Sequence, residues 1–235
     1  MTITPVVSRT INHIGFIAGI IAFGAAVAYS IVQVLQLYGI TAYPTDEILI
    51  YSTSLLIVIP FLSEILALHY VVPTEKKFWT HLAVLFATIY AVFVTANYVV
   101  QLATVIPMSM KEKLDEIRIL QQTPHSLFWD FDGIGYIFMG LATAALIPVF
   151  KRHGLEKWVR VAFIGNALMT SLITIVYFYP TYSYKLLLIA FPWAITAPVS
   201  ILLLAFVFKQ NNHVRQQRVK KLDPVPLVVE EQEEY

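Results

Sequence analysis

The chain contains no cysteine and little charge. The absence of cysteine from all 235 residues excludes disulfides, thiolate catalysis and cysteine-ligated metal sites. Charged residues make up 13% of the chain, whereas a soluble domain carries about 25% because its surface must face water. Hydrophobic residues make up 58%, and the mean hydropathy is +0.70. We therefore expect lipid to be the solvent of this chain, and a net charge of +1 predicts no nucleic-acid partner.

The motifs of common enzyme and cofactor sites are also missing. There is no phosphate loop, no Ser-His-Asp arrangement, no zincin motif and no aspartate-rich motif of a prenyl transferase. No lysine lies within the last three apolar stretches, which excludes a retinal Schiff base. Membrane haem proteins hold their cofactor with histidines that lie within the helices. In this chain the histidines at the ends of apolar stretches are His13, His69, His81 and His153. We therefore expect no metal site and no cofactor.

Six stretches are long and apolar enough to cross a bilayer, which takes about 20 residues. They cover approximately residues 14–38, 48–72, 78–107, 133–150, 158–179 and 186–208. The predicted fold is an all-α, six-helix transmembrane bundle. The fourth stretch is short, and Thr123-Pro124 predicts an earlier start because it combines an N-cap residue with proline at the first helical position. The first stretch has an alternative interpretation as a cleaved signal peptide, given the small residues at Ala26–Ala28.

The distribution of Lys and Arg predicts the orientation in the membrane. If the N-terminus is cytoplasmic, 12 of the 16 basic residues fall in the inner segments, and the first outer loop has none. Cytoplasmic loops carry the excess of positive charge in membrane proteins. We therefore expect a multi-pass protein of the cell membrane with both termini in the cytoplasm.

Two segments are expected to lie outside the bilayer. Between the third and fourth stretches, Ser109 and Glu112 form a capping box, and Leu114, Ile117 and Leu120 recur at helical spacing. This pattern predicts a short amphipathic helix on the outer membrane surface. Residues 209–235 are basic and then acidic, with little to bury, and are predicted to form a disordered cytoplasmic tail.

Small and polar residues recur at helical spacing within all six stretches and mark their inward faces. The side chains nearest the outer side predict a polar pocket opening outward, lined by the first, third, fourth and fifth helices. Its candidate binding residues are Gln33, Asn97, Gln101, Asp132 and Tyr136. The amides have an alternative role as hydrogen-bonding contacts between helices. Asp132 has an alternative role as a residue favoured by the helix dipole.

Two further candidate binding residues, Glu64 and Asn166, lie deeper, toward the inner side. A carboxyl group at such depth is costly and is by default a functional-site hypothesis, as a proton carrier, a cation ligand or a general acid. The alternative for Glu64 is a protonated side chain that bonds to a backbone carbonyl freed by Pro60.

Two segments, Ala96–Pro107 and Ser126–Phe150, resemble a group of small prokaryotic multi-pass membrane proteins without an assigned function. The similarity covers about a sixth of the chain and implies no activity. It includes Asn97, Gln101 and Tyr136, which periodicity also places inside.

Three hypotheses of function follow. The first is a small transporter or binding protein whose outward-facing pocket takes a small-molecule or lipophilic ligand, with Glu64 as the coupling site. The second is a membrane-embedded enzyme with a lipophilic substrate, in which Glu64 or Asp132 supplies the proton. Its apolar pocket is lined by Tyr136, Tyr177 and Trp193. The third is a structural or sensory membrane subunit. Membrane lipid is the one expected partner, and the oligomeric state is not predicted.

Overall fold

A computed structural model of the chain describes residues 5–222, apart from the side chains of residues 5–8, 114, 184 and 213–222. The described residues form helices and contain no strand. Six helices are long and apolar enough to cross a membrane. They cover Arg9–Leu37, Thr45–Val71, Thr74–Ser109, Leu127–Val149, Gly154–Phe178 and Lys185–Asn212. The predicted all-α, six-helix bundle is confirmed, and the fold is that of a multi-pass membrane protein.

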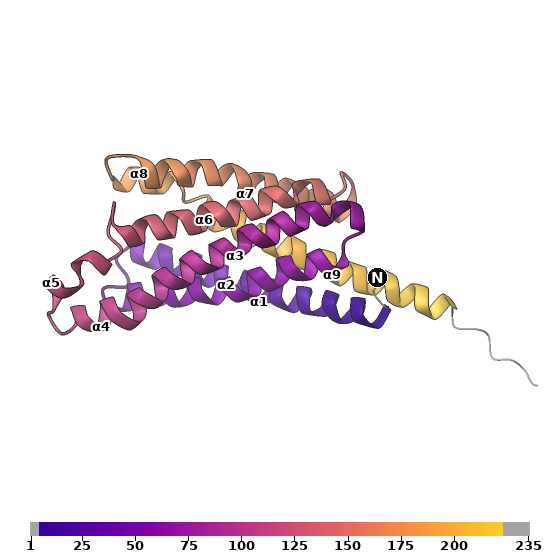
Figure 1. Cartoon of the computed structure of the whole chain (residues 1–235), viewed down its shortest axis with the longest axis horizontal. Helices are drawn as coiled ribbons and strands as arrows, with labels where there is room; N and C mark the ends of the chain where they lie inside the picture. Colours follow the sequence, from indigo (N-terminus) through magenta and orange to yellow (C-terminus); the bar gives the residue numbers. More distant parts are fainter. Residues whose placement is uncertain (1–4, 223–235) are drawn as a thin grey trace, which may run out of the picture.

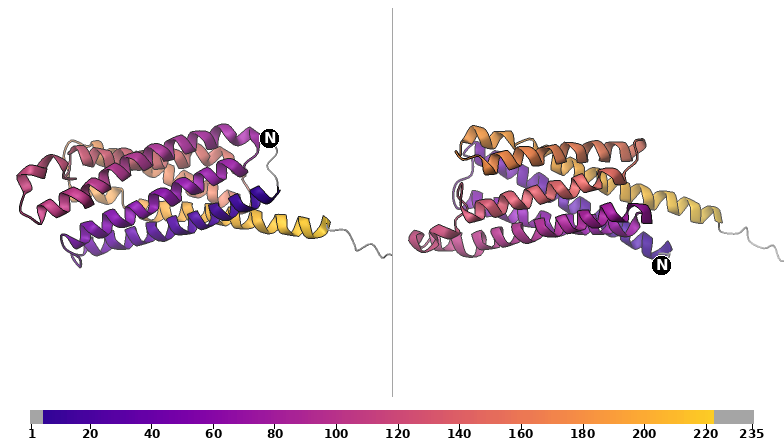
Figure 2. Two further views of the ribbon diagram at one scale, coloured as in Figure 1. Left: turned by 60° about the horizontal axis from the view of Figure 1, so that its bottom comes forward. Right: turned by 45° about the horizontal axis from the view of Figure 1, so that its top comes forward.

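The long helices form a closed ring in chain order. They are α1 (Pro5–Leu37), α2 (Thr45–Val71), α3 (Lys77–Val100), α6 (Leu127–Leu146), α7 (Gly154–Phe178) and α9 (Trp193–Leu222). Each packs on the helix before and after it, and α9 closes the ring against α1. The short helices α4 (Ile106–Ser109), α5 (Leu114–Ile117) and α8 (Tyr184–Ile189) lie at one end of the bundle, called here the α5 end (Figures 1 and 2). Helix α1 begins at the opposite end.

Small residues on the inward faces allow close contact between α1 and α9. A Cβ atom added at Gly15 would lie 2.7 Å from the ring of Phe208, and one added at Gly19 would lie 2.7 Å from the Cβ of Ala205. In lipid, helix association depends on such close van der Waals packing, because the lipid tails are as apolar as the side chains. The small-residue face of the first helix is therefore used within the bundle.

The outward faces of the ring carry large apolar side chains. Leu56, Ile59, Val92, Leu168 and Ile195 are each exposed by 60% or more. Exposure of so many large apolar groups around a helical bundle is unfavourable in water and suits the hydrocarbon of a bilayer.

Basic side chains at the opposite end bond to carbonyl groups near helix C-termini. The Arg160 guanidinium donates to the carbonyl of Ile147 at 2.7 Å, and Lys76 and Lys77 donate to the carbonyls of Val149 and His69. Cations at these positions satisfy carbonyl groups that lack an intrahelical donor.

The fourth span begins earlier than residue 133, as expected, but at a different cap. Helix α6 begins at Leu127, and the Ser126 hydroxyl accepts a hydrogen bond from the backbone N–H of Trp129 at 3.2 Å. Ser126 thus takes the role that the sequence assigned to Thr123. The early start places Asp132 in the second turn of the helix.

The third span contains a π-helical turn over Gln101–Val105 before it continues as α4. A π turn inserts one extra residue, so the positions after it rotate relative to the α-helical stripe. Accordingly, Val105 is buried, whereas Thr104, at the α-helical spacing of three residues from the buried Gln101, is only half-buried. π turns inside α-helices are frequent at functional sites.

The connection between the third and fourth spans contains α5 and a 3-10 turn over Arg118–Leu120. Its start differs from the expected capping box, because Ser109 is the last residue of α4 and Glu112 has a positive φ of 60°. Ile117 is fully buried, so the segment packs onto the bundle through an apolar side chain.

The segment after the last span also differs from its prediction. Helix α9 continues to Leu222, so residues 209–222, which were expected to be disordered, are helical. This stretch has no glycine or proline to end a helix until Pro224, and its Lys, Arg and Gln residues favour helix. The remaining part of the predicted tail, residues 223–235, lies outside the described residues.

Candidate functional site

The candidate site is a cavity of about 480 Å³ at the α5 end, partly open to the surface of the bundle. Its wall consists of residues from α1, α6, α7 and the segment that contains α8 and the start of α9. The residues that line it are Tyr29, Gln33, Gln36, Leu37, Tyr136, Ile173, Tyr177, Tyr182, Leu187, Leu188, Ala190, Phe191, Trp193 and Ala194. Ligand pockets of proteins have volumes of about 300–1,000 Å³. The cavity is therefore large enough for a small molecule.

One side of the cavity is a break in the last span. The sequence predicts a continuous helix over 186–208, but α8 ends at Ile189 and α9 begins at Trp193. Tight hydrogen bonds between residues three apart, such as Phe191 N–H to the carbonyl of Leu188 at 3.1 Å, connect the two helices. Pro192 has no N–H and cannot continue the helix. Non-helical backbone within a membrane is tolerated where it is buried in protein or lines a cavity. Here the non-helical residues Ala190 and Phe191 line the cavity.

The Ser30 side chain fixes α1 to the start of α9. Its hydroxyl lies 3.0 Å from the carbonyl of Ala194 and 2.9 Å from the carbonyl of Ala26 in its own helix. The Ala194 carbonyl is in the first turn of α9, close to the break. The bond holds the cavity wall from α9 against the wall from α1.

Aromatic rings form much of the cavity wall. The Trp193 ring lies edge-on to Tyr29 with centroids 5.6 Å apart and edge-on to Tyr136 at 4.8 Å. Behind the wall, the Trp129 ring is tilted by 35° against that of Tyr177, with centroids 4.6 Å apart, and meets Tyr182 edge-on at 5.7 Å. Such edge-to-face and offset pairs stabilise one arrangement of the rings beyond their burial. The tyrosines add hydroxyl groups to an otherwise apolar surface.

Asp132 lies directly behind the tyrosines, 5% exposed. The Tyr98 hydroxyl donates to Oδ1 at 2.5 Å, the Tyr177 hydroxyl donates to Oδ2, and the Asn97 amide lies 3.4 Å from Oδ1. Each of these groups can donate, so the arrangement suits an ionised carboxylate, which only accepts hydrogen bonds. The Tyr136 hydroxyl, 3.0 Å from that of Tyr98, links the carboxylate to the cavity.

Two glutamines and an asparagine attach the segment around α5 over this carboxylate. Asn97 Nδ2 donates to the Gln122 side chain at 2.9 Å, and Gln101 Nε2 donates to the carbonyl of Leu120 at 2.8 Å. The backbone N–H of Gln122 donates in return to Gln101 Oε1 at 3.2 Å. Gln101 begins the π turn of the third span, so this turn is where the span meets the connection that contains α5.

Glu64 is in a different place, in the half of the bundle away from the cavity. It is fully buried in α2, and its carboxyl group faces Gly19 of α1 so closely that a Cβ atom there would overlap it. Within residues 5–222, neither carboxyl oxygen has a hydrogen-bond partner. Gly19 precedes Tyr29 by ten residues, which corresponds to about 15 Å along the helix. Glu64 is therefore well separated from the cavity.

Asn166 connects three helices. Its amide Nδ2 donates to the Thr143 hydroxyl of α6 at 3.1 Å, and its Oδ1 accepts from the Thr196 hydroxyl of α9 at 3.3 Å. Thr143 in turn donates to the carbonyl of Gly140 at 2.8 Å. These bonds occupy the amide, so Asn166 acts as a contact between helices rather than as a lining residue.

The predicted site residues thus fall into three groups. Gln33 and Tyr136 line the cavity; Asn97, Gln101 and Asp132 form the network behind it; Glu64 and Asn166 lie elsewhere. The cavity wall comes from the first, fourth, fifth and sixth spans, whereas the third was expected and the sixth was not. Tyr98 and Tyr136 occupy the space between the third span and the cavity.

Sequence reasoning missed Tyr98 and Gln122. Tyr98 follows Asn97 directly and therefore lies about 100° around the helix, outside the stripe that was followed. Gln122 lies after Leu120, the last residue of the apolar pattern in its connection, so no periodic pattern assigns it to an inward face. A buried carboxylate needs more than one hydrogen-bond donor. Tyr98 lies at the depth in the membrane that was expected for Asp132, and this shared depth was the available signal for it.

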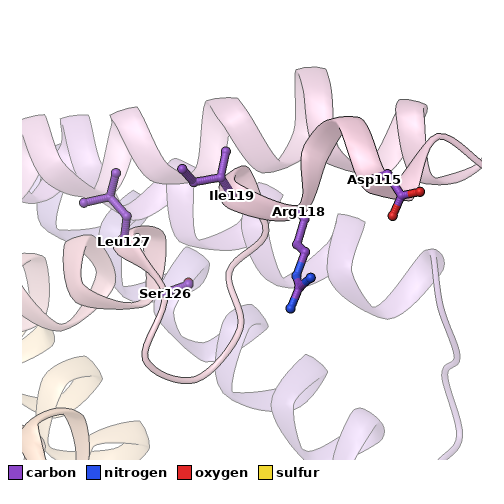
Figure 3. A pocket seen from close by; sticks show the side chains of 5 residues that line it. All are labelled: Asp115, Arg118, Ile119, Ser126 and Leu127. Carbon is purple, nitrogen blue, oxygen red and sulfur yellow. The ribbon is translucent and has the colours of Figure 1, made fainter.

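A second depression, of about 430 Å³, lies on the surface beside the 3-10 turn, between Asp115, Arg118, Ile119, Ser126 and Leu127 (Figure 3). Asp115, Arg118 and Ile119 are exposed. Among the described residues, no group of three or more His, Asp or Glu side chains is arranged to hold a metal ion. The cavity beside α8 is therefore the better candidate for a binding site.

Comparison of the chain with protein-family models, with curated proteins and with solved structures gives no match.

Proposed function

We propose that the protein is a small transporter or binding protein of the cell membrane, with both termini in the cytoplasm and a pocket that takes a small molecule from the outer side. The observation that carries this proposal is the break between α8 and α9, which lines a cavity at the α5 end. Secondary transporters commonly use discontinuous helices of this kind to build their substrate sites. The positive-inside distribution of Lys and Arg supports an outer location for this end.

Glu64 is the coupling residue in this proposal. A buried carboxyl group without a partner is expensive in the membrane, and such residues commonly carry protons in transporters. Gly19 and Ala205 border it, so a small movement of α1 against α9 would change its access to water. Protonation and ligand binding would then be linked through α1, which carries Tyr29 at the cavity and Gly19 beside Glu64.

The binding step is tested by closing the cavity. Ala194→Trp places a large ring inside it, whereas Ile195→Trp, one residue further and 64% exposed, places the same ring in lipid. A panel of small cations, anions and neutral compounds is screened by thermal unfolding in lipid nanodiscs. We expect at least one compound to stabilise the parent and the Ile195 variant but not the Ala194 variant. Stabilisation of all three proteins alike, or of none, contradicts a pocket function and favours a structural or sensory subunit.

The transport step is tested with the compound that binds. In proteoliposomes, a concentration jump of this compound is expected to produce a pH-dependent current or flux. Glu64→Gln should abolish the dependence on pH, whereas Glu75→Gln, on the exposed turn before α3, should leave it unchanged. Uptake that survives Glu64→Gln with the same pH dependence excludes Glu64 as the coupling residue.

The alternative proposal is a membrane-embedded enzyme with a lipophilic substrate. Leu187, Leu188 and Phe191 give the cavity an apolar side that would suit such a substrate. However, Asp132 is separated from the cavity by the hydroxyl groups of Tyr98 and Tyr177, so it is badly placed for proton transfer to a ligand. Recovery of the bound compound unchanged after prolonged incubation supports binding or transport, and chemical conversion supports the enzyme.

A further inference from the structure

Four polar side chains that line the cavity each direct a hydrogen away from it, namely Tyr136, Tyr177, Gln33 and Gln36. The Tyr177 hydroxyl donates to Asp132. Tyr98 uses its single hydrogen on the same carboxylate, so in the contact between Tyr98 and Tyr136 the donor is Tyr136. On the α1 side, Gln33 Nε2 donates to the hydroxyl oxygen of Tyr29 at 3.1 Å. The hydroxyl oxygens of Tyr136 and Tyr177 thereby keep lone pairs that can accept hydrogen bonds from a ligand.

A second carboxylate is arranged in the same way. Gln36 lines the cavity, and its Nε2 donates to Asp46 Oδ2 at 2.9 Å. Asp46 is 8% exposed. Asp132 and Asp46 are thus joined to different parts of the wall, Asp132 by a donor on α7 and Asp46 by a donor on α1.

No basic side chain balances these two carboxylates. Among the described residues, the one ion pair joins Lys113 and Glu116 on the surface, and the cavity lining contains no Lys, Arg or His. An unbalanced negative charge inside a low-dielectric region raises the local concentration of cations and excludes anions.

The aromatic rings of the wall favour the same kind of ligand. Tyr29, Tyr136 and Trp193 meet edge to face, and Tyr177 and Phe191 complete the aromatic lining. Aromatic faces attract ammonium groups through their quadrupole, most strongly where water is excluded, and rings grouped in this way form the known cages for quaternary ammonium.

We propose that the cavity binds an organic cation, namely an ammonium group carried on an apolar body. The ammonium group would lie among the ring faces and hydroxyl oxygens near Tyr136 and Tyr177. The apolar body would pack on Leu187, Leu188 and Phe191. This inference rests on the proposed function, because it names the class of ligand for the same pocket.

Three probes of similar size separate charge from shape. Benzyltrimethylammonium is the cation, neopentylbenzene is its neutral isostere, and phenylacetate is an anion. Binding to the full chain in nanodiscs is measured by calorimetry, with empty nanodiscs subtracted. We expect the cation to bind at least about tenfold more tightly than the isostere, as one charge at an effective dielectric of about 20 provides. Phenylacetate should not bind.

Variants then locate the charge that is recognised. Asp132→Asn should weaken binding of the cation about tenfold or more without changing that of the neutral isostere, and Asp46→Asn should weaken it less. Asp130→Asn is the matched control, because Asp130 is exposed on the same helix. If Asp132→Asn does not fold, Asp46→Asn and Tyr136→Phe retain the test, since each leaves the Asp132 contacts from Tyr98, Tyr177 and Asn97 in place.

The outcomes distinguish this inference from the proposed function. If phenylacetate or the isostere binds more tightly than the cation, and Ala194→Trp abolishes this binding, the cation is the wrong class of ligand. The proposed function as a binding pocket is then retained. Cation binding that Asp132→Asn and Asp46→Asn leave unchanged also overturns the cation site, because the charges would then play no part. Absence of binding by all three probes and by the screening panel overturns the pocket function and the cation together.

Discussion

Replacing Glu64 by methionine is expected to stabilise the protein. The side chain is fully buried, and neither carboxyl oxygen has a partner within residues 5–222. A buried polar group that is left unsatisfied costs about 1–3 kcal/mol. Methionine is unbranched and adapts to irregular spaces, so Glu64→Met removes that cost with little strain. We therefore expect a gain of about 1–3 kcal/mol. A buried carboxyl group that lowers stability is better explained by function than by packing.

The assay is reversible unfolding in mixed micelles, in which SDS is titrated against a mild detergent and helix content is followed by circular dichroism. Glu64→Gln serves as the isosteric comparison, and its change should stay within about 1 kcal/mol because the amide is equally without a partner. Glu75→Gln, on an exposed turn, should change the stability by less than about 0.5 kcal/mol. A loss of about 2 kcal/mol or more in Glu64→Met would refute the reasoning, because it would mean that the carboxyl group makes a stabilising contact.

Two further predictions concern the packing of α6 on α7 and the connection that contains α5. Gly140→Ala should destabilise the bundle by about 1–3 kcal/mol in the same SDS titration, because the added Cβ would overlap the Thr170 side chain. Gly24→Ala is the control: its Cβ would have no neighbour within 4 Å, so this substitution should stabilise the bundle by about 0.5–1 kcal/mol. Equal effects of the two substitutions would contradict the contact between α6 and α7. Gln101→Ala removes both bonds to the segment around Leu120, so hydrogen exchange of the amides at 117–123 should accelerate about tenfold by mass spectrometry, with Gln121→Ala as the control. Unchanged exchange would show that Ile117 and the bond between Asn97 and Gln122 hold the segment without Gln101.

Hydropathy and helical periodicity predicted the span number and much of the buried network. The fold could be predicted because an apolar stretch of about 20 residues in lipid must satisfy its backbone hydrogen bonds internally, and a helix does this. The stripe on the third span identified Asn97 and Gln101, and the stripe on the fourth identified Asp132 and Tyr136. The structure connects Asn97, Asp132 and Tyr136 through Tyr98.

The remaining features depend on local backbone that a regular period does not describe. The π turn at Gln101 adds a residue to the helix, which shifts the stripe beyond it. In the last span, Pro192 was counted as part of a continuous apolar helix, since a single proline does not lower the hydropathy of a span. Tight turns at Ala190 and Phe191 end α8 there, and the resulting break creates one wall of the cavity.

The central claim is that a negatively polarised cavity at the α5 end opens to the outer side of the membrane. The chain has no cysteine, so Ala194→Cys would introduce a single thiol into the cavity wall, and Ala197→Cys, fully buried one turn deeper, is its matched control. Intact cells are treated with membrane-impermeant methanethiosulfonates that carry either trimethylammonium or sulfonate. We predict that the thiol at 194 reacts from outside, several-fold faster with the cationic reagent, and that the thiol at 197 does not react. No reaction at 194, or faster reaction with the anionic reagent, would contradict the account.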